Sequence, residues 1–221
     1  MEARLAEISR EEALRYMGVR GAPDDALVRD LDRCEALLRS AARPRTVWKL
    51  FRRTAEGTLE GTSFRPRGRD LARLLSGDRV ILMAATLGLE TEALLRRAQH
   101  ASMSDALILD ALASAAIESV CDRLCAELAD RMAPRVLTPR FSPGYGDFPL
   151  EQQQELCRVL NVSRLLGITL SPGGLMIPQK SVTAVLGVLE QAPPQEKAGC
   201  AACAYSDRCL YRREGLTCGK S

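Results

Sequence analysis

The chain has 221 residues, with a hydrophobic fraction of 46%, a charged fraction of 27% and a formal net charge of +3. These values are typical of a soluble globular protein with one large domain or one domain and a small appendage. A net charge so close to zero gives no support for nucleic-acid binding. Residues 1–10 lack the apolar core of a signal peptide, and the most apolar run, residues 80–89, is too short to span a membrane. We therefore expect a cytoplasmic protein that acts without membrane or nucleic acid.

The content of histidine and cysteine restricts the possible chemistry. A single histidine, His100, argues against a Ser-His-Asp hydrolase and against a histidine-based metal site. Eight cysteines in a reducing compartment favour metal binding or core packing over a disulfide framework.

The N-terminal half alternates between helical and extended patterns. Residues 46–53 alternate in polarity and are followed by Gly57 and a second extended run at 58–64, which predicts a β-hairpin. Residues 80–85 are apolar throughout, as in a buried strand. The helices predicted in this half span residues 2–17, about 24–42, 70–75 and 89–99.

The longest helical pattern covers residues 104–132 and is apolar on most faces, which predicts a central, buried helix. Asp110, Ser114, Glu118 and Asp122 are spaced four residues apart and form one polar stripe along it. An unpaired carboxylate in the middle of a buried helix is costly. Glu118 is therefore expected either to pair with an arginine or to face a polar pocket. Cys121 and Cys125 are expected to be small core residues.

Residues 140–149, with the sequence RFSPGYGDFP, combine two prolines, two glycines and three aromatic side chains. The prolines and glycines argue against a continuous helix or central strand here. Gly144 and Gly146 permit positive φ and a close approach of the backbone to a ligand. Two interpretations remain open, a ligand-binding loop and an ordered connector whose aromatic rings cap the core.

After this loop the pattern predicts a helix at 150–161 and strands at 168–170, 175–177 and 181–189. Together with the first half, this indicates an α+β fold in which a long central helix packs on a mixed or antiparallel twisted sheet. Residues 191–198 contain two prolines and read as a linker. We expect one domain over residues 1–190 and a linker with a small cysteine-rich tail over 191–221.

The pattern Arg-x-x-x-Gly-Tyr at 140–145 resembles the S-adenosylmethionine-binding signature of the activation domain of cobalamin-dependent methionine synthase. The resemblance covers mainly residues 104–189, and weaker similarity to free-standing relatives of that domain occurs at residues 15–16 and 86–88. The further matching segments are Ala111-Leu112-Ala113 followed by Glu118, Gly167-Ile168-Thr169-Leu170, Met176-x-Pro178 and Ser181-Val182.

The resemblance implies a domain that binds S-adenosylmethionine through the side chains of Glu118, Arg140 and Tyr145. It further implies ligand contacts with the backbone at Ser142 and Gly144. The family also uses an early aspartate, whose counterpart the sequence does not reveal. Such domains supply the methyl group for the reductive methylation, and hence the reactivation, of an oxidised cobalamin. The chain contains no obvious corrinoid-binding domain, so a cobalamin-dependent methionine synthase or another corrinoid protein is expected as a partner in trans. The chain would then be the methyl-transfer component of that system.

Four cysteines, Cys200, Cys203, Cys209 and Cys218, are close together near the end of the chain. Four thiolates without histidine suit a tetrahedral site for an iron–sulfur cluster or a structural zinc ion. Free or redox-active thiols are the alternative. An iron–sulfur cluster here could pass an electron to the cobalamin of the partner.

Two other functions fit the same sequence. The chain could be a non-catalytic module that docks on a corrinoid protein, with a structural zinc ion in its tail. It could also be an unrelated redox protein with a thiolate-bound metal. Binding of S-adenosylmethionine would favour the methyl-donor function, and metal-dependent binding of a partner without it would favour the docking module.

Overall fold

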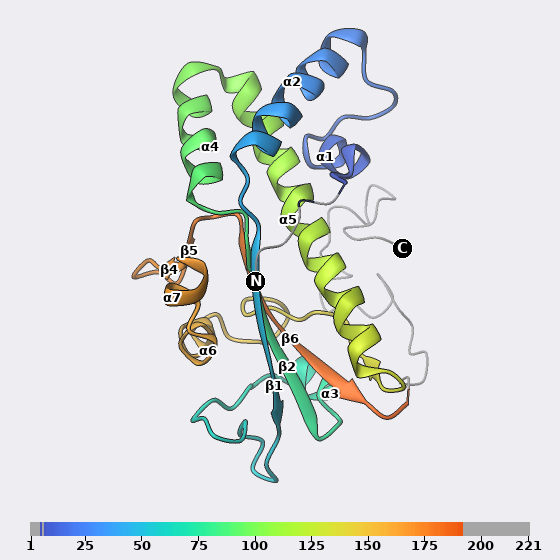
Figure 1. The fold of residues 1–221 in the computed structure, drawn as a ribbon, viewed down its shortest axis with the longest axis vertical. Helices are drawn as coiled ribbons and strands as arrows, with labels where there is room; N and C mark the ends of the chain where they lie inside the picture. Colours follow the sequence, from blue (N-terminus) through green and yellow to red (C-terminus); the bar gives the residue numbers. More distant parts are fainter. Residues whose placement is uncertain (1–4, 6, 192–221) are drawn as a thin grey trace.

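The computed structural model describes residue 5 and residues 7–191; the predicted cysteine cluster, Cys200, Cys203, Cys209 and Cys218, lies outside the described residues. Four antiparallel strands form the main sheet, in the order β1-β2-β6-β3 (Figure 1). A separate small ladder pairs β4 with β5. The strands are β1 (Arg45–Arg52), β2 (Arg79–Thr86), β3 (Val136–Leu137), β4 (Thr169–Leu170), β5 (Met176–Ile177) and β6 (Ser181–Leu189).

Helices cover both faces of this sheet, and this explains why β2 is apolar at nearly every position. The protein has two hydrophobic cores, one on each face of the sheet. Ile81, Met83 and Ala85 point into the first core, which contains α5. Val80 and Leu82 point into the second core, because successive side chains in a strand lie on opposite faces. The helices are α1 (Arg10–Tyr16), α2 (Asp25–Ala41), α3 (Arg69–Leu74), α4 (Leu89–Ala101), α5 (Met103–Met132), α6 (Gln152–Leu160) and α7 (Val162–Leu166).

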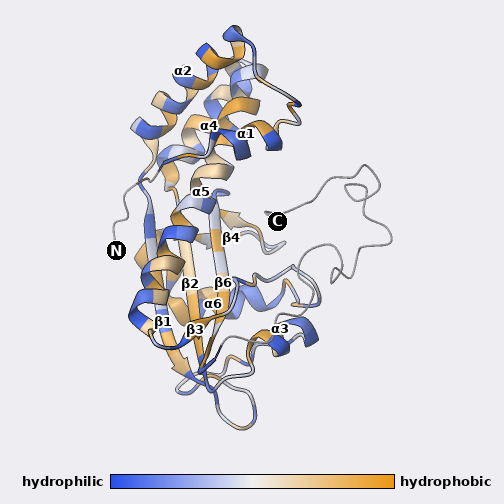
Figure 2. Ribbon diagram, turned by 90° about the vertical axis from the view of Figure 1, so that its right-hand side faces the viewer, coloured by the Kyte–Doolittle hydropathy of each residue, from blue (hydrophilic) through white to orange (hydrophobic). Residues whose placement is uncertain are grey.

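The 30-residue helix α5 organises the first core. Its buried residues run from Ala106 to Leu128, and α1, α2 and α4 pack around its N-terminal half (Figure 1). Its C-terminal half lies along β2 and β6. In Figure 2, β2 and β6 are mainly orange, whereas blue hydrophilic residues are frequent along α2. Among the described residues, no helix is long and apolar enough to cross a membrane.

The structure confirms the α+β fold with a long central helix and an antiparallel sheet. The hairpin predicted for residues 46–53 and 58–64 is wrong, because β1 pairs along its whole length with β2. Only the bridge between Arg53 and Leu59 joins the two segments that were expected to pair. The first helix begins at Arg10, with Ser9 as its N-cap, later than expected. The elements β3 and α7 were not predicted.

Candidate functional site

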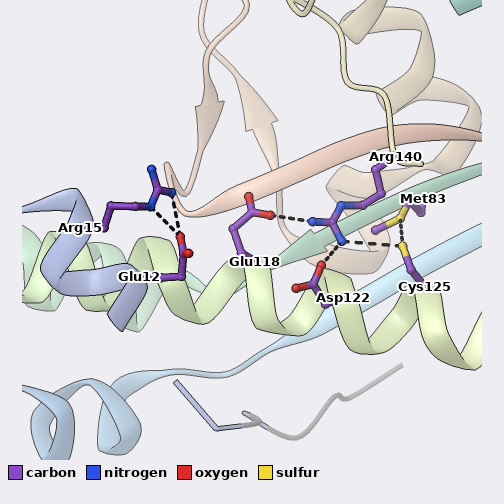
Figure 3. A network of polar contacts seen from close by, with 7 residues as sticks. All are labelled: Glu12, Arg15, Met83, Glu118, Asp122, Cys125 and Arg140. Carbon is purple, nitrogen blue, oxygen red and sulfur yellow. Dashed lines mark hydrogen bonds and ion pairs between the residues drawn. The ribbon is translucent and has the colours of Figure 1, made fainter. Parts of the chain in front are cut away.

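Arg140 binds the polar stripe of α5 from the loop that follows β3. Its Nη2 donates to Glu118 Oε2 and its Nη1 donates to Asp122 Oδ1, both at 2.6 Å (Figure 3). Glu118 and Asp122 are one helical turn apart, so one planar guanidinium reaches both. The sequence left open whether Glu118 pairs with an arginine or faces a polar pocket. The structure shows the pairing, and the pocket is present as well.

The environment of Arg140 combines burial with strong pairing. Its side chain is 22% exposed, whereas those of Glu118 and Asp122 are about half exposed. Burial by itself lowers the pKa of Arg140, but the hydrogen bond to Asp122 raises it above its ordinary value. The guanidinium therefore carries a permanent charge. Since it has five N–H donors, further donors can bind a ligand.

Two thiols lie under this ion pair. Arg140 Nη1 is 3.8 Å from Cys125 Sγ, which in turn lies 3.9 Å from Met83 Sδ (Figure 3). Burial raises the pKa of both thiols, to about 12 in Cys121. Both thiols are therefore neutral at physiological pH; Cys121 is a buried core residue, as the sequence predicted, and Cys125 is partly buried and packs against the core. No group of three or more histidine, cysteine or acidic side chains that could hold a metal ion occurs in the described part of the chain.

The loop that carries Arg140 is anchored to the sheet. Phe141 exchanges two backbone hydrogen bonds with Val185 of β6, at 3.0 and 2.9 Å. The ring of Phe141 stacks at 6.3 Å on that of Phe148, which is buried. The aromatic rings thus cap the second core, as in the connector interpretation of this segment. They also fix the position of Arg140 and Tyr145, so the two interpretations are compatible.

Tight turns place Tyr145 at the outer end of the loop. The backbone N–H of Tyr145 donates to Ser142 O at 3.1 Å, and that of Gly144 donates to Phe148 O at 2.8 Å. Gly144 has a φ of +90°, which disfavours any residue with a Cβ. Ser142 and Gly144, predicted as ligand contacts, shape the turn here, and ligand contact by either remains a prediction. Tyr145 is 69% exposed.

Gly146 and Asp147 join the loop to α3. Asp147 accepts hydrogen bonds from the backbone N–H groups of Arg69 and Asp70, at 2.6 and 3.0 Å. These bonds lower the pKa of Asp147, and they satisfy donors at the start of α3 that Gly68 has no side chain to cap. A Cβ at Gly146 would lie 2.7 Å from Asp70 Oδ2 and 3.0 Å from Phe141 Cζ, so a larger residue here would have to displace these side chains.

A cavity of about 360 Å³ lies beside the Arg140 cluster; we call it the α1–α5 cavity. Its walls come from α1, from one side of α5 and from the loop. The predicted side chains Glu118, Arg140 and Tyr145 all line it, although Tyr145 is 27 residues from Glu118. Its lining residues are Ser9, Glu12, Arg15, Tyr16, Ala115, Glu118, Ser119, Asp122, Arg140 and Tyr145.

Helix α1 supplies residues that the sequence did not assign to the site. Arg15 Nη2 pairs with Glu12 Oε2 at 2.7 Å, and the Arg15 guanidinium lies 4.8 Å from the centre of the Tyr16 ring. Figure 3 shows the Glu12–Arg15 pair next to Glu118 along α5. The weak resemblance at residues 15–16 was the only signal for this part. The sequence did not reveal a counterpart of the family's early aspartate. In the structure, one carboxylate from the N-terminal part of the chain, that of Glu12, lines the cavity.

Comparison with models of protein families finds no match, and comparison with curated proteins finds none either. Among solved structures, the chain is similar to the crystal structure of the MetH reactivation domain bound to AdoHcy (S-adenosylhomocysteine). The TM-score is 0.61 with 16% sequence identity, over 98% of this chain and 85% of that chain. This protein therefore has the fold of the MetH reactivation domain.

Proposed function

We propose that this chain binds S-adenosylmethionine in the α1–α5 cavity and donates its methyl group to the cobalamin of a separate corrinoid protein, such as methionine synthase. One observation carries the proposal. The three side chains that the resemblance implies, Glu118, Arg140 and Tyr145, line one cavity in a fold whose solved relative holds S-adenosylhomocysteine.

The cavity fits the chemistry of a zwitterionic nucleoside. Arg140 offers N–H donors to the carboxylate of the ligand. Glu118, with its side chain 47% exposed, can accept hydrogen bonds from an ammonium group or from ribose hydroxyl groups. The phenol ring of Tyr145 can stack on a flat ring. The volume of about 360 Å³ lies in the range of small-molecule sites.

The chain's part in methyl transfer is orientation. The electrophile is the sulfonium methyl group, and the methyl acceptor is the reduced cobalt of the partner's cobalamin. The bond from sulfur to methyl breaks as the cobalt–methyl bond forms, and the sulfur keeps its electron pair in S-adenosylhomocysteine. No proton moves in this step, so no acid or base is required of the protein. Holding the methyl group toward the partner is the chain's contribution to the rate.

The partner's cobalt must gain an electron before it accepts the methyl group. No electron carrier occurs among the described residues. We propose that Cys200, Cys203, Cys209 and Cys218 hold an iron–sulfur cluster that delivers this electron. Anaerobic purification followed by iron, sulfide and zinc analysis tests this. About four irons and four sulfides per chain would fit a [4Fe–4S] cluster held by four thiolates. A colourless, zinc-loaded protein would instead indicate a structural tail and a separate reductant.

Isothermal titration calorimetry with S-adenosylmethionine tests the binding site. Arg140→Ala should weaken binding tenfold or more, because a hydrogen bond to a charged group contributes about 1.5–3 kcal/mol. Arg33→Ala is the matched control, since Arg33 also pairs with α5, through Asp105 at 2.7 Å, but does not line the cavity. Equal affinity of the two variants would refute the site.

A methyl-transfer assay tests the function itself. The full chain is mixed with S-adenosylmethionine and a partner that carries inactive cobalamin, with and without a chemical reductant. Methylcobalamin should form only when S-adenosylmethionine and an electron source are both present. Binding to the partner without binding of S-adenosylmethionine would instead identify a docking module.

A further inference from the structure

Both tyrosines of the described chain, Tyr16 and Tyr145, line the α1–α5 cavity. They are 43% and 69% exposed, and they reach the cavity from two different elements, α1 and the loop after β3. Tyrosine rings combine an apolar body with a polar tip and are enriched at binding interfaces. Two of them on the walls of one cavity indicate a ligand with a flat ring.

Packing, and not intrinsic stability, holds α1 in place. A helix of seven residues has too few hydrogen bonds to persist alone. Ile8 and Ala13 are buried in the first core, and Ser119 Oγ of α5 donates to Glu7 O at 2.8 Å. Arg10 pairs with Asp32 and Glu35 of α2, at 2.7 and 2.8 Å. The position of Tyr16 at the end of α1 is therefore set by the docking of α1 on α5 and α2.

Tyr16 is placed to recognise a ring. Its neighbour Arg15 lies over the ring at 4.8 Å and is itself fixed by Glu12. A ring held by a guanidinium loses little freedom when a ligand stacks on it. Burial, and then the negative charge of Glu118, raise the pKa of Tyr16, so its hydroxyl group stays protonated.

We infer that α1 is the nucleoside-binding wall of the cavity, with Tyr16 stacking on the purine ring while Arg140 binds the amino-acid part of the ligand. This assignment rests on the proposed function. It divides the ligand between two sets of side chains: Arg140 of the loop after β3 binds the charged amino acid, and Tyr16 of α1, together with Tyr145, contacts the base. Ligand binding then stabilises the docked position of α1.

Calorimetry with two ligands distinguishes binding of the nucleoside from binding of the amino-acid part. S-adenosylmethionine carries both parts, and 5′-methylthioadenosine carries only the nucleoside. Tyr16→Leu should weaken binding of both ligands about tenfold, which is about 1.4 kcal/mol. Tyr16→Phe keeps the ring and should bind both within about twofold of wild type. Arg140→Ala should weaken binding of S-adenosylmethionine but leave 5′-methylthioadenosine within about twofold.

Glu11→Ala is the control within α1, because Glu11 does not line the cavity. Hydrogen exchange gives a second readout, in which 5′-methylthioadenosine should slow exchange of the α1 amides in wild type and less so in Tyr16→Leu. If wild type binds S-adenosylmethionine and Tyr16→Leu binds it equally well, the assignment of α1 is refuted and the proposed function stands. If wild type binds neither ligand, both are refuted.

Discussion

The two ends of the polar stripe on α5 contain similar ion pairs with different surroundings. At one end Lys180 binds Asp110 and Ser114, both at 2.8 Å, and at the other Arg140 binds Glu118 and Asp122. The two cations are similarly shielded, with side chains 14% and 22% exposed. In the part of the chain that the structure describes, both tyrosine rings line a cavity beside the Arg140 end.

The surroundings of Lys180 are those of a structural joint. Its carbonyl oxygen accepts the N–H of Leu87 at 3.0 Å, and the next residue, Ser181, bonds to Thr86 at 2.8 Å. The pair at this end holds α5 against the start of β6. A buried cation with two acceptors is therefore not by itself a sign of a binding site. The adjoining cavity and aromatic rings make the difference at Arg140.

Charge reversal should separate the two ends most strongly. Glu118→Lys places a second cation next to Arg140 and removes an acceptor, so we expect affinity for S-adenosylmethionine to fall about 100-fold. Asp110→Lys makes the same change beside Lys180 and should leave affinity within about threefold. Calorimetry measures both, with circular dichroism to show that each variant folds. Similar losses in the two variants would contradict the comparison.

Two milder substitutions, one at each end of the stripe, test the same comparison. Asp122→Asn weakens one of the two charge-assisted bonds that orient Arg140, and should lower affinity about fivefold. Ser114→Ala removes the corresponding partner of Lys180 and should have no effect on binding. The affinities of the two variants, measured at equal ionic strength, check this. An Asp122→Asn variant that binds as tightly as wild type would show that Glu118 alone orients Arg140.

Stability should respond at the Lys180 end. Lys180→Met keeps the aliphatic stem but leaves Asp110 and Ser114 without their cation, and should lower the free energy of unfolding by about 1 kcal/mol. Arg123→Met is the control, because the Arg123–Glu127 pair is about half exposed on both sides. Urea unfolding measures both. No difference between them would show that the Lys180 joint contributes no more than a surface pair.

A separate prediction concerns pH and the Cys121 thiol beneath Arg140. Burial raises the pKa of Cys121 from 9.0 to about 12, so the thiol ionises more readily in the unfolded chain. Its contribution to stability is complete below pH 9 and is lost as the pH rises from 9 to 12, by up to about 1.4 kcal/mol per pH unit. Urea unfolding between pH 7 and 11 should show this decline. A parallel decline in Cys121→Ala would assign it to other groups.

Local patterns predicted much of this fold. The lengths of α5 and β2 follow from long apolar segments, and the loop at 140–149 follows from its prolines and glycines. The strand with which β1 pairs could not be predicted in the same way. Residues 46–53 are followed by a segment with an extended pattern at 58–64, but β2 offers eight consecutive partners, six of them apolar, and β1 pairs with β2 instead. Such a choice depends on burial of both faces, which no local window reveals.

The same limit applies to the site. Glu118, Arg140 and Tyr145 were identified by resemblance, and the stripe on α5 by its four-residue spacing. Glu12 and Tyr16 lie on a seven-residue helix with ordinary amphipathic composition. They belong to the cavity because α1 docks on α5, which is a property of tertiary packing. The ion pair between Arg140 and Asp122 likewise depends on where β3 ends.

The position of Gly146 against α3 affects the interpretation of sequence conservation among relatives of this protein. Its φ of +51° and the 2.7 Å that would separate a Cβ from Asp70 Oδ2 favour glycine at this position, whatever the loop binds. An invariant glycine here would record the mechanical fit of the loop against α3. Gly144, whose Cβ would meet only Leu150 at 3.6 Å, is restricted by backbone conformation alone. In an alignment, variation at Arg140 and Tyr145 on an unchanged Gly146 would mark proteins that kept the scaffold and changed the ligand.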